Sequence, residues 1–156
     1  MATPTSLPAT FVAGNVLTAA QMNDLRGAFR ILQLVNDYDT STITTTSTSF
    51  VATNASVTIT PSATSSKIFL IGSVYAFKNS SAGADTYLSF DRDGTTISAE
   101  TRYTQDTANY RISTAVVYLD SPSSTSALTY TLEWKVSSGT GQIENAHSIT
   151  ALEVSA

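Results

Sequence analysis

Apolar and polar residues alternate with a period of two over most of the chain from Thr40 onward. Successive side chains of a β-strand point to opposite faces, so this alternation predicts strands with one buried face. Clusters of Ser, Gly, Asn and Pro interrupt it and mark turns. The segments bounded in this way are 42–50, 56–60, 67–77, 86–92, 95–102, 111–119, 127–137 and 147–154. Eight short strands without intervening helices predict a mainly β fold, an antiparallel β-sandwich or jelly roll over residues 37–156.

Hydroxyl side chains take the place of charge on the surface of such a domain. Ser and Thr make up 48 of the 156 residues, whereas only 13% of the residues are charged, against roughly 25% in an average soluble domain. Thr suits pleated strands and Ser suits turns. A chain of this length can bury a core without disulfides, and it contains no Cys. We therefore expect one β domain with a nearly neutral surface suited to contact with other protein.

Two of the strand segments predict different surroundings. In 127–137 the alternation is strict, with Trp134 on the apolar side, which predicts one buried face and one solvated face. In 67–77 both sides are apolar, with Ile68, Leu70 and Val74 on one side and Phe69, Ile71, Tyr75 and Phe77 on the other. A second apolar side needs a cover, which could be a helix of the same chain or another subunit. The candidate subunit-interface residues are Phe69, Ile71, Tyr75 and Phe77.

One amphipathic helix is predicted for residues 17–36. Thr18 and Gln21 have the spacing of a capping box, and Leu17 and Met22 have the spacing of a hydrophobic staple. The apolar stripe consists of Met22, Leu25, Phe29 and Leu32. Such a stripe must dock, either onto the β domain of its own chain or onto a neighbouring subunit.

An extended arm is predicted for residues 1–16. It contains Pro4 and Pro8 and has too few apolar residues to build a core of its own. The arm could lie on its own domain or on a neighbour. The candidate partner-contact residues of the arm and of the helix are Leu7, Phe11, Val12, Val16, Met22, Leu25, Phe29 and Leu32.

No pattern predicts a catalytic, cofactor or metal site, and we expect that the chain is not an enzyme. His147 is the only histidine and is interpreted as a structural or surface residue. Asp91 to Gly94 opens like a calcium loop, but the twelfth position is Arg102 where a calcium loop needs Glu. Asp93-Gly94 instead predicts a hairpin turn. Trp134 is expected in the core, whereas the loop-flanking Tyr87, Tyr103 and Tyr110 are candidates for exposed contacts.

The charge of the chain argues against several partners. The formal net charge is −4, and the eight Lys and Arg residues are scattered, so no nucleic-acid partner is expected. The N-terminus lacks the basic and apolar regions of a signal peptide, and no apolar run reaches the ~20 residues of a membrane span. We expect a protein that is made in the cytoplasm and has no membrane partner.

Segments at both ends and in the middle of the chain resemble a known pattern. FVAGNVLTAAQMN at residues 11–23, followed by Leu25-Arg26, resembles the opening shared by many tailed-bacteriophage virion proteins. Ile59-Thr60-Pro61, Ser65-Ser66-Lys67-Ile68 and the closing residues 149–154 (ITALEV) resemble the β domain that often follows this opening. The resemblance implies homotrimers of a jelly-roll domain, either in tail fibres and spikes or in capsid decoration (cement) proteins. Fibre proteins with this opening are commonly longer, which favours the decoration role.

These observations together give one expected function and one alternative. The expected function is a homotrimeric capsid decoration protein that binds the major capsid protein and stabilises the assembled shell, located on the capsid surface of the virion. The alternative is a short tail fibre or receptor-binding tip that contacts host-surface glycan through Tyr103 or Tyr110. Neither function requires a cofactor.

Overall fold

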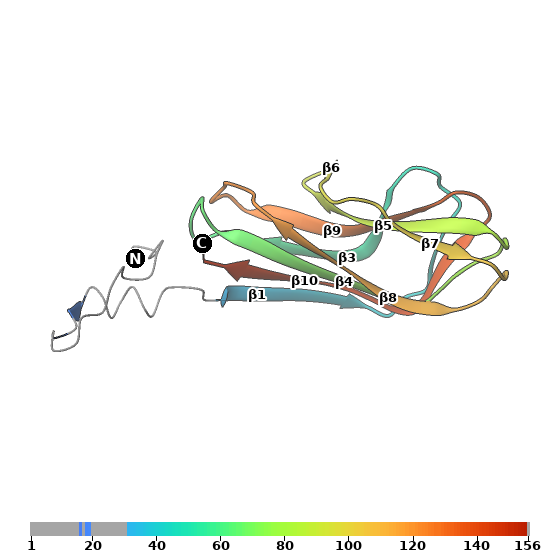
Figure 1. Ribbon diagram of the computed structural model, residues 1–156, viewed down its shortest axis with the longest axis horizontal. Coiled ribbons are helices and arrows are strands. Elements are labelled where there is room, and N and C mark those ends of the chain that lie inside the picture. Colours follow the sequence, from blue (N-terminus) through green and yellow to red (C-terminus); the bar gives the residue numbers. More distant parts are fainter. Residues whose placement is uncertain (1–15, 17, 20–30, 156) are drawn as a thin grey trace.

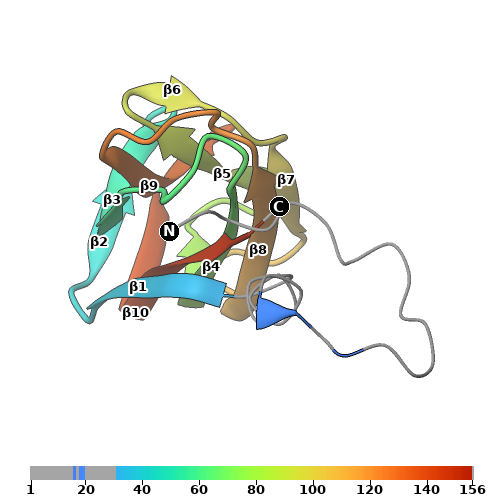
Figure 2. The same cartoon turned by 90° about the vertical axis from the view of Figure 1, so that its left-hand side faces the viewer.

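The computed structural model describes residues 16, 18, 19 and 31–155. Residues 31–155 form two antiparallel sheets that pack as the two layers of a sandwich (Figures 1 and 2). The strands are β1 (Ile31–Asp39), β2 (Ile43–Thr45), β3 (Val51–Ile59), β4 (Lys67–Asn79), β5 (Ala84–Arg92), β6 (Thr95–Thr96), β7 (Thr101–Gln105), β8 (Ile112–Asp120), β9 (Leu128–Val136) and β10 (Gly141–Val154). The predicted mainly β sandwich is confirmed, and residues 31–155 contain no helix.

The two sheets have simple strand orders. Sheet A runs β1-β10-β4-β8, and β2 also pairs with β10. Sheet B runs β3-β9-β5-β6, and β7 also pairs with β5. We call the end of the sandwich where Ile31 lies opposite Val154 the base. The opposite end, where Asn79 pairs with Gly141, is called the loop end.

The helix predicted for residues 17–36 is wrong over residues 31–36. These residues belong to β1, which pairs with β10 from Ile31 opposite Val154 to Asp39 opposite His147. Leu32 is therefore a half-buried strand residue and not the last residue of a helical stripe. Pairing with a neighbouring strand satisfies the backbone and overrides the local helical periodicity. The rest of the predicted helix and arm lies outside the described residues, except for Val16, Thr18 and Ala19, which are exposed.

Most of the predicted strands exist, but β3 and β10 begin five or six residues earlier than predicted, and two other segments are not single strands. The segment 42–50 is not one strand, because β2 ends at Thr45 and β3 begins at Val51. The segment 95–102 is divided between β6 and β7, with an irregular stretch between them. The hairpin turn at Asp93-Gly94 is confirmed, since both residues have positive φ angles (51° and 87°).

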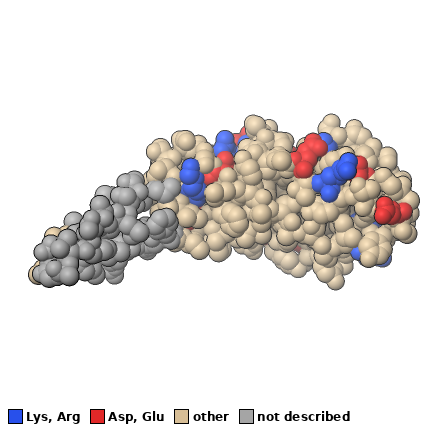
Figure 3. Space-filling view, viewed as in Figure 1, with Lys and Arg blue, Asp and Glu red and all other residues tan. Residues whose placement is uncertain are grey.

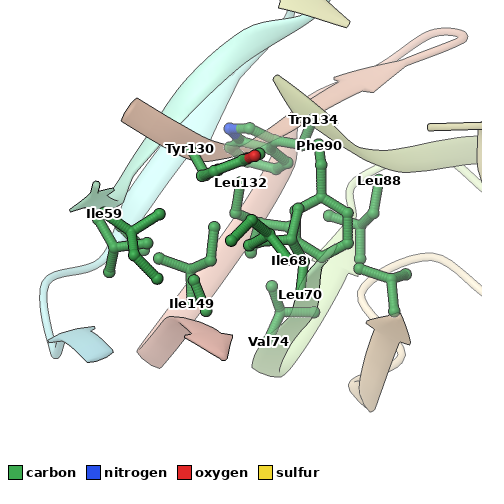
Figure 4. Packing of buried hydrophobic residues seen from close by; sticks show 14 of the residues in the cluster. Ile59, Ile68, Leu70, Val74, Leu88, Phe90, Tyr130, Leu132, Trp134 and Ile149 are labelled. Atoms are coloured by element: carbon green, nitrogen blue, oxygen red, sulfur yellow. The ribbon is translucent and has the colours of Figure 1, made fainter. Parts of the chain in front are cut away.

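The core lies between the inner faces of the two sheets. Trp134 is 1% exposed, which confirms its predicted core position. Figure 4 shows Leu132 and Phe90 of sheet B packed towards Ile68 and Leu70 of β4. The layers approach closely at Gly72 of β4, where an added Cβ would lie 2.8 Å from Leu132 Cδ1. Gly72 is thus required by packing, because any side chain would push the sheets apart.

A β-bulge changes which way the end of β4 faces. The register with β8 shifts between Val74 and Phe77, and Ala76 has a φ of 49°. The inserted residue reverses the alternation, so Phe77 points into the core and is 0% exposed. The prediction that Phe77 shares an outer face with Phe69, Ile71 and Tyr75 is therefore wrong.

Two buried carboxylates organise the base of the sandwich. Glu153 accepts hydrogen bonds from Ser62 N (2.6 Å) and Gln33 Nε2 (2.6 Å), which joins the loop after β3 to β1 and β10. These donors lower the pKa of Glu153 and outweigh its burial. Asp120 accepts from Arg92 Nη1 (2.7 Å) and Tyr130 Oη (2.7 Å), which links sheet A to sheet B. These two buried carboxylates are thus paired, as a stable interior requires.

Replacing Gly72 with Ala is expected to destabilise the domain by about 1–3 kcal/mol, because the new Cβ overlaps Leu132 and Phe90. Chemical denaturation measures the free energy of unfolding. Leu132→Val removes the overlapping Cδ1 atom, so we expect the double variant to lose less stability than the sum of the two single variants. Strict additivity would contradict the close-approach explanation.

Candidate subunit interface

The outer face of sheet A carries apolar side chains in register across four strands. Directly opposed residues of antiparallel strands point to the same face of a sheet. The row nearest the base contains Leu34, Leu152, Phe69 and Leu119. The second row contains Asn36, Thr150, Ile71 and Val117, and the third contains Tyr38, Ser148, Ser73 and Ala115. We call these three rows the apolar face.

The apolar face is open to solvent in the single chain. Leu34 is 60% exposed, Leu119 is 54% exposed and Val117 is 63% exposed. Tyr38 (61%), Tyr75 (56%) and Ile31 (59%) are exposed at its margins. The large hydrophobic side chains that are exposed within residues 31–155 lie on or beside this face, except Tyr110. Contiguous exposed apolar surface of this kind marks an interaction site.

No member of the three rows is charged, and the charged groups lie beyond them. Lys67 lies at the base and donates to Ser121 Oγ (2.8 Å). At the loop end, Glu144 accepts from Lys78 Nζ (2.6 Å) and Arg111 Nε (2.5 Å). These two cations lower the pKa of Glu144 to about 2. A neutral centre between charged ends suits contact with another neutral apolar surface.

The outer face of sheet B has a different character. Thr58 of β3 and Thr129 of β9 lie side by side, with hydroxyls 3.1 Å apart. Lys135 of β9 pairs with Glu100 (2.5 Å), and its ammonium lies 4.5 Å from the ring centroid of Phe50. Figure 3 shows that charged groups on the viewed side of the molecule are few and separated by uncharged surface. Sheet B thus presents a hydroxyl-rich solvated face, and sheet A presents the apolar one.

The structure brings three of the four proposed subunit-interface residues together. Phe69 and Ile71 lie in the first two rows, and Tyr75 follows on the same strand. Phe77 does not belong to this face, because the bulge at Ala76 turns it into the core. Of the proposed partner-contact residues, Val16 is 91% exposed and Leu32 is half-buried in β1. The remaining ones lie outside the described residues: Leu7, Phe11, Val12, Met22, Leu25 and Phe29.

Of the three rows, the sequence identified only Phe69 and Ile71. Leu34 was missed because residues 17–36 were assigned to a helix, and Tyr38 because it lies before the first predicted strand, 42–50. Val117 and Leu119 belong to β8, where Val116 and Tyr118 make the opposite side apolar too. That two-sided pattern is the same signal that singled out β4, and it could have identified β8 as its neighbour on this face.

The tyrosines proposed as loop contacts differ in their surroundings. Tyr103 packs edge-on against Phe77, with ring centroids 6.1 Å apart, and its hydroxyl accepts from Thr114 Oγ1 (2.6 Å). The ammonium of Lys135 lies over the ring of Tyr87, 4.9 Å from the centroid of that ring. Tyr110 alone of these is largely exposed, at 62%. Tyr103 is therefore part of the packing between the sheets.

His147 lies inside the sandwich, which confirms its interpretation as a structural residue. It is 1% exposed, and neither ring nitrogen has a hydrogen-bond partner. Burial lowers the pKa of His147, while the carboxylates of Asp39 and Asp37 on β1 act in the opposite direction. A neutral imidazole in this position tolerates burial far better than an imidazolium would.

Within the described part of the chain, no group of three or more His, Cys, Asp or Glu side chains is arranged to hold a metal ion. The helix search, limited to the same residues, finds no segment capable of crossing a membrane. No protein-family model matches the sequence, and no curated protein matches it significantly.

Acidification is expected to destabilise the domain through His147. The unfolded chain binds a proton near the ordinary histidine pKa of ~6.5, whereas burial lowers the pKa in the folded chain. The free energy of unfolding should therefore fall as the pH drops below ~6.5, by at most ~1.4 kcal/mol per pH unit from this group. Denaturant titrations at pH 7.5, 6 and 5 measure the effect. His147→Leu should flatten this part of the profile, and an unchanged profile in that variant would contradict the assignment.

Proposed function

We propose that this chain is a non-enzymatic structural protein of a tailed-phage virion, and that three copies associate through their apolar faces to decorate the capsid. The observation that carries the proposal is the apolar face itself, which combines the exposed Leu34, Leu119 and Val117 with an absence of charge in the three rows. Burying such a surface is favourable by roughly 25 cal/mol per Å². When copies of the chain associate, their apolar faces come together, and no charge of the three rows has to lose its water.

The strand order supports the jelly-roll part of this proposal. From β3 onward the chain passes repeatedly from one sheet to the other, with β3, β5 and β9 in sheet B and β4, β8 and β10 in sheet A. This exchange between layers is typical of a jelly roll, which closes off most sheet edges. The resemblance of residues 11–23 to the opening of phage virion proteins supports the assignment to a virion.

The position of the base suggests how the trimer would hold the shell. β1 begins and β10 ends at the base, so the first described strand starts beside the end of the last one (Figure 1). A trimer joined through sheet A would gather three N-terminal segments at one end. Three linked contacts raise the effective concentration of each contact on the capsid. Binding that requires the assembled lattice stabilises the shell by mass action.

The second candidate, a short tail fibre or receptor-binding tip, is favoured by one observation. Tyr110 is exposed at the loop end, which is opposite the base. The number of copies per virion separates the two candidates. A number comparable to that of the major capsid protein identifies a decoration protein, and a few copies per particle identify a tail component.

Val117→Asp is expected to dissociate the trimer into folded monomers. Val117 is 63% exposed in the single chain. The carboxylate introduced there would therefore be hydrated in a monomer, but in the trimer it would lose water and lie near the same charge on the other copies. Sedimentation velocity at micromolar concentration reports the mass, and circular dichroism reports the fold. Thr58→Asp on the outer face of sheet B is the matched control and should remain trimeric. A Val117→Asp protein that keeps the mass of the wild type would overturn the assignment of this face.

Deleting residues 1–16 is expected to leave a folded trimer that no longer binds capsids. The reason is that the proposed subunit interface lies within residues 34–152, whereas the proposed capsid contact includes the arm. Co-sedimentation with purified undecorated capsids measures binding. Undiminished decoration by the truncated protein would remove the arm from the capsid contact.

A further inference from the structure

An open hollow at the loop end lies between the end of β7 and the start of β8. Its volume is about 290 Å³, near the lower end of the range for small-molecule sites, roughly 300–1,000 Å³. The residues that line it are Thr104, Gln105, Asp106, Thr107, Tyr110 and Ile112. It belongs to neither the base nor the three rows of the apolar face.

The loop that forms the hollow is held in place by a buried amide. Gln105 is 3% exposed, and its Nε2 donates to the carbonyl oxygens of Tyr110 (2.9 Å) and Phe77 (3.2 Å). Its Oε1 accepts from the backbone N–H of Asn79. The N–H of Asn109 donates to the carbonyl of the same Asn79 (2.7 Å). The position of Tyr110 is thus fixed by the fold, so a ligand would not have to order the loop.

Three of the polar groups around the hollow are unused by the protein itself, whereas Thr104 donates to Asp85 Oδ1 (2.5 Å). Among the carboxylates in residues 31–155, Asp106 is the one with neither a hydrogen bond nor an ion pair. The hydroxyl groups of Thr107 and Tyr110 likewise have no protein partner. The ring of Tyr110 is exposed beside them at 62%. The hollow therefore combines an exposed aromatic ring on an anchored backbone, a free carboxylate and two free hydroxyls.

We propose that this hollow binds one neutral hexopyranose unit, such as the terminal residue of a polysaccharide. The ring of Tyr110 would stack on the C–H face of the sugar. Asp106 would accept hydrogen bonds from two neighbouring sugar hydroxyls, a charge-assisted arrangement stronger than a neutral one. Acidic sugars are disfavoured by the same carboxylate and by the net charge of −4.

This proposal goes beyond the capsid role and does not depend on it. A trimer joined through the apolar face would leave the hollow outside the interface, because none of its lining residues belongs to the three rows. A chain attached through its base would then present three such hollows at the opposite end.

Saturation-transfer difference NMR on the full chain tests the proposal. The probes are the methyl glycosides of glucose, galactose, mannose and N-acetylglucosamine, each at 10 mM. We expect saturation transfer to the pyranose C–H protons of at least one of them. Tyr110→Ala should reduce affinity by about fivefold or more, and Tyr110→Phe, which keeps the ring, should retain most of it. Asp106→Asn should weaken binding with the fold unchanged, since Asp106 has no protein partner.

Thr125→Ala, in the exposed loop before β9 at the base, is the distant control and should bind like the wild type. The absence of transfer to all four glycosides would overturn the proposal, as would wild-type binding by both Tyr110→Ala and Asp106→Asn. Sedimentation of the same samples reports the oligomeric state separately, so a failed sugar site is distinguishable from a failed trimer.

Discussion

Sheet A is apolar on both of its faces, and both the packing of the sandwich and the proposed assembly depend on this. On the inner side, Gly72 lets β4 approach Leu132 and Phe90 of sheet B so closely that no side chain fits between the layers. On the outer side, the same strand carries Phe69 and Ile71 into rows that extend across β10 to β1 and β8. A sheet with one solvated side does not need this pattern. The inner face accounts for the fold, and the outer face is the reason to propose an assembly.

In this domain, hydroxyl groups and a few buried carboxylates make polar contacts for which other domains use charged side chains. The hydroxyls of Ser73 and Ser148 lie 2.8 Å apart across β4 and β10, and those of Ser89 in β5 and Ser98 between β6 and β7 also lie 2.8 Å apart. Glu153 is 0% exposed, yet it is satisfied by donors from β1 and from the loop after β3. The hydroxyl-rich composition fits this arrangement, because short hydroxyl side chains satisfy local polar groups without adding net charge to the surface.

The sequence predicted the sandwich because its strands carry a strong two-residue period and its turns carry their own chemistry, as Asp93-Gly94 does. The sequence-based prediction was wrong where pairing with a strand far away in the chain determines the local structure. The capping signals at Thr18 and Gln21 mark where a helix could begin but do not say where it ends, and no Gly or Pro follows between Arg30 and Asp39. Residues 31–36 become a strand because β10, more than a hundred residues later, offers an edge.

The candidate interface was predictable in part for the same reason. Phe69 and Ile71 follow from the two-sided pattern of a single strand, but their neighbours Leu34 and Leu119 depend on a register that no local pattern contains. Phe77 was misplaced because the positive φ of Ala76 reverses the alternation, and alanine gives no warning of it. The hollow beside Tyr110 depends on Gln105 and Asn79 meeting across the loop end, which again requires the fold.

Sedimentation equilibrium of the full chain at low micromolar concentration measures whether the apolar face associates with other copies. If three copies cover each other's apolar faces as proposed, a single species with three times the 16.5 kDa mass of one chain is expected. A monomer of 16.5 kDa that stays soluble at these concentrations would show that the outer face of sheet A is not a self-association surface. That result would rule out the proposed trimer.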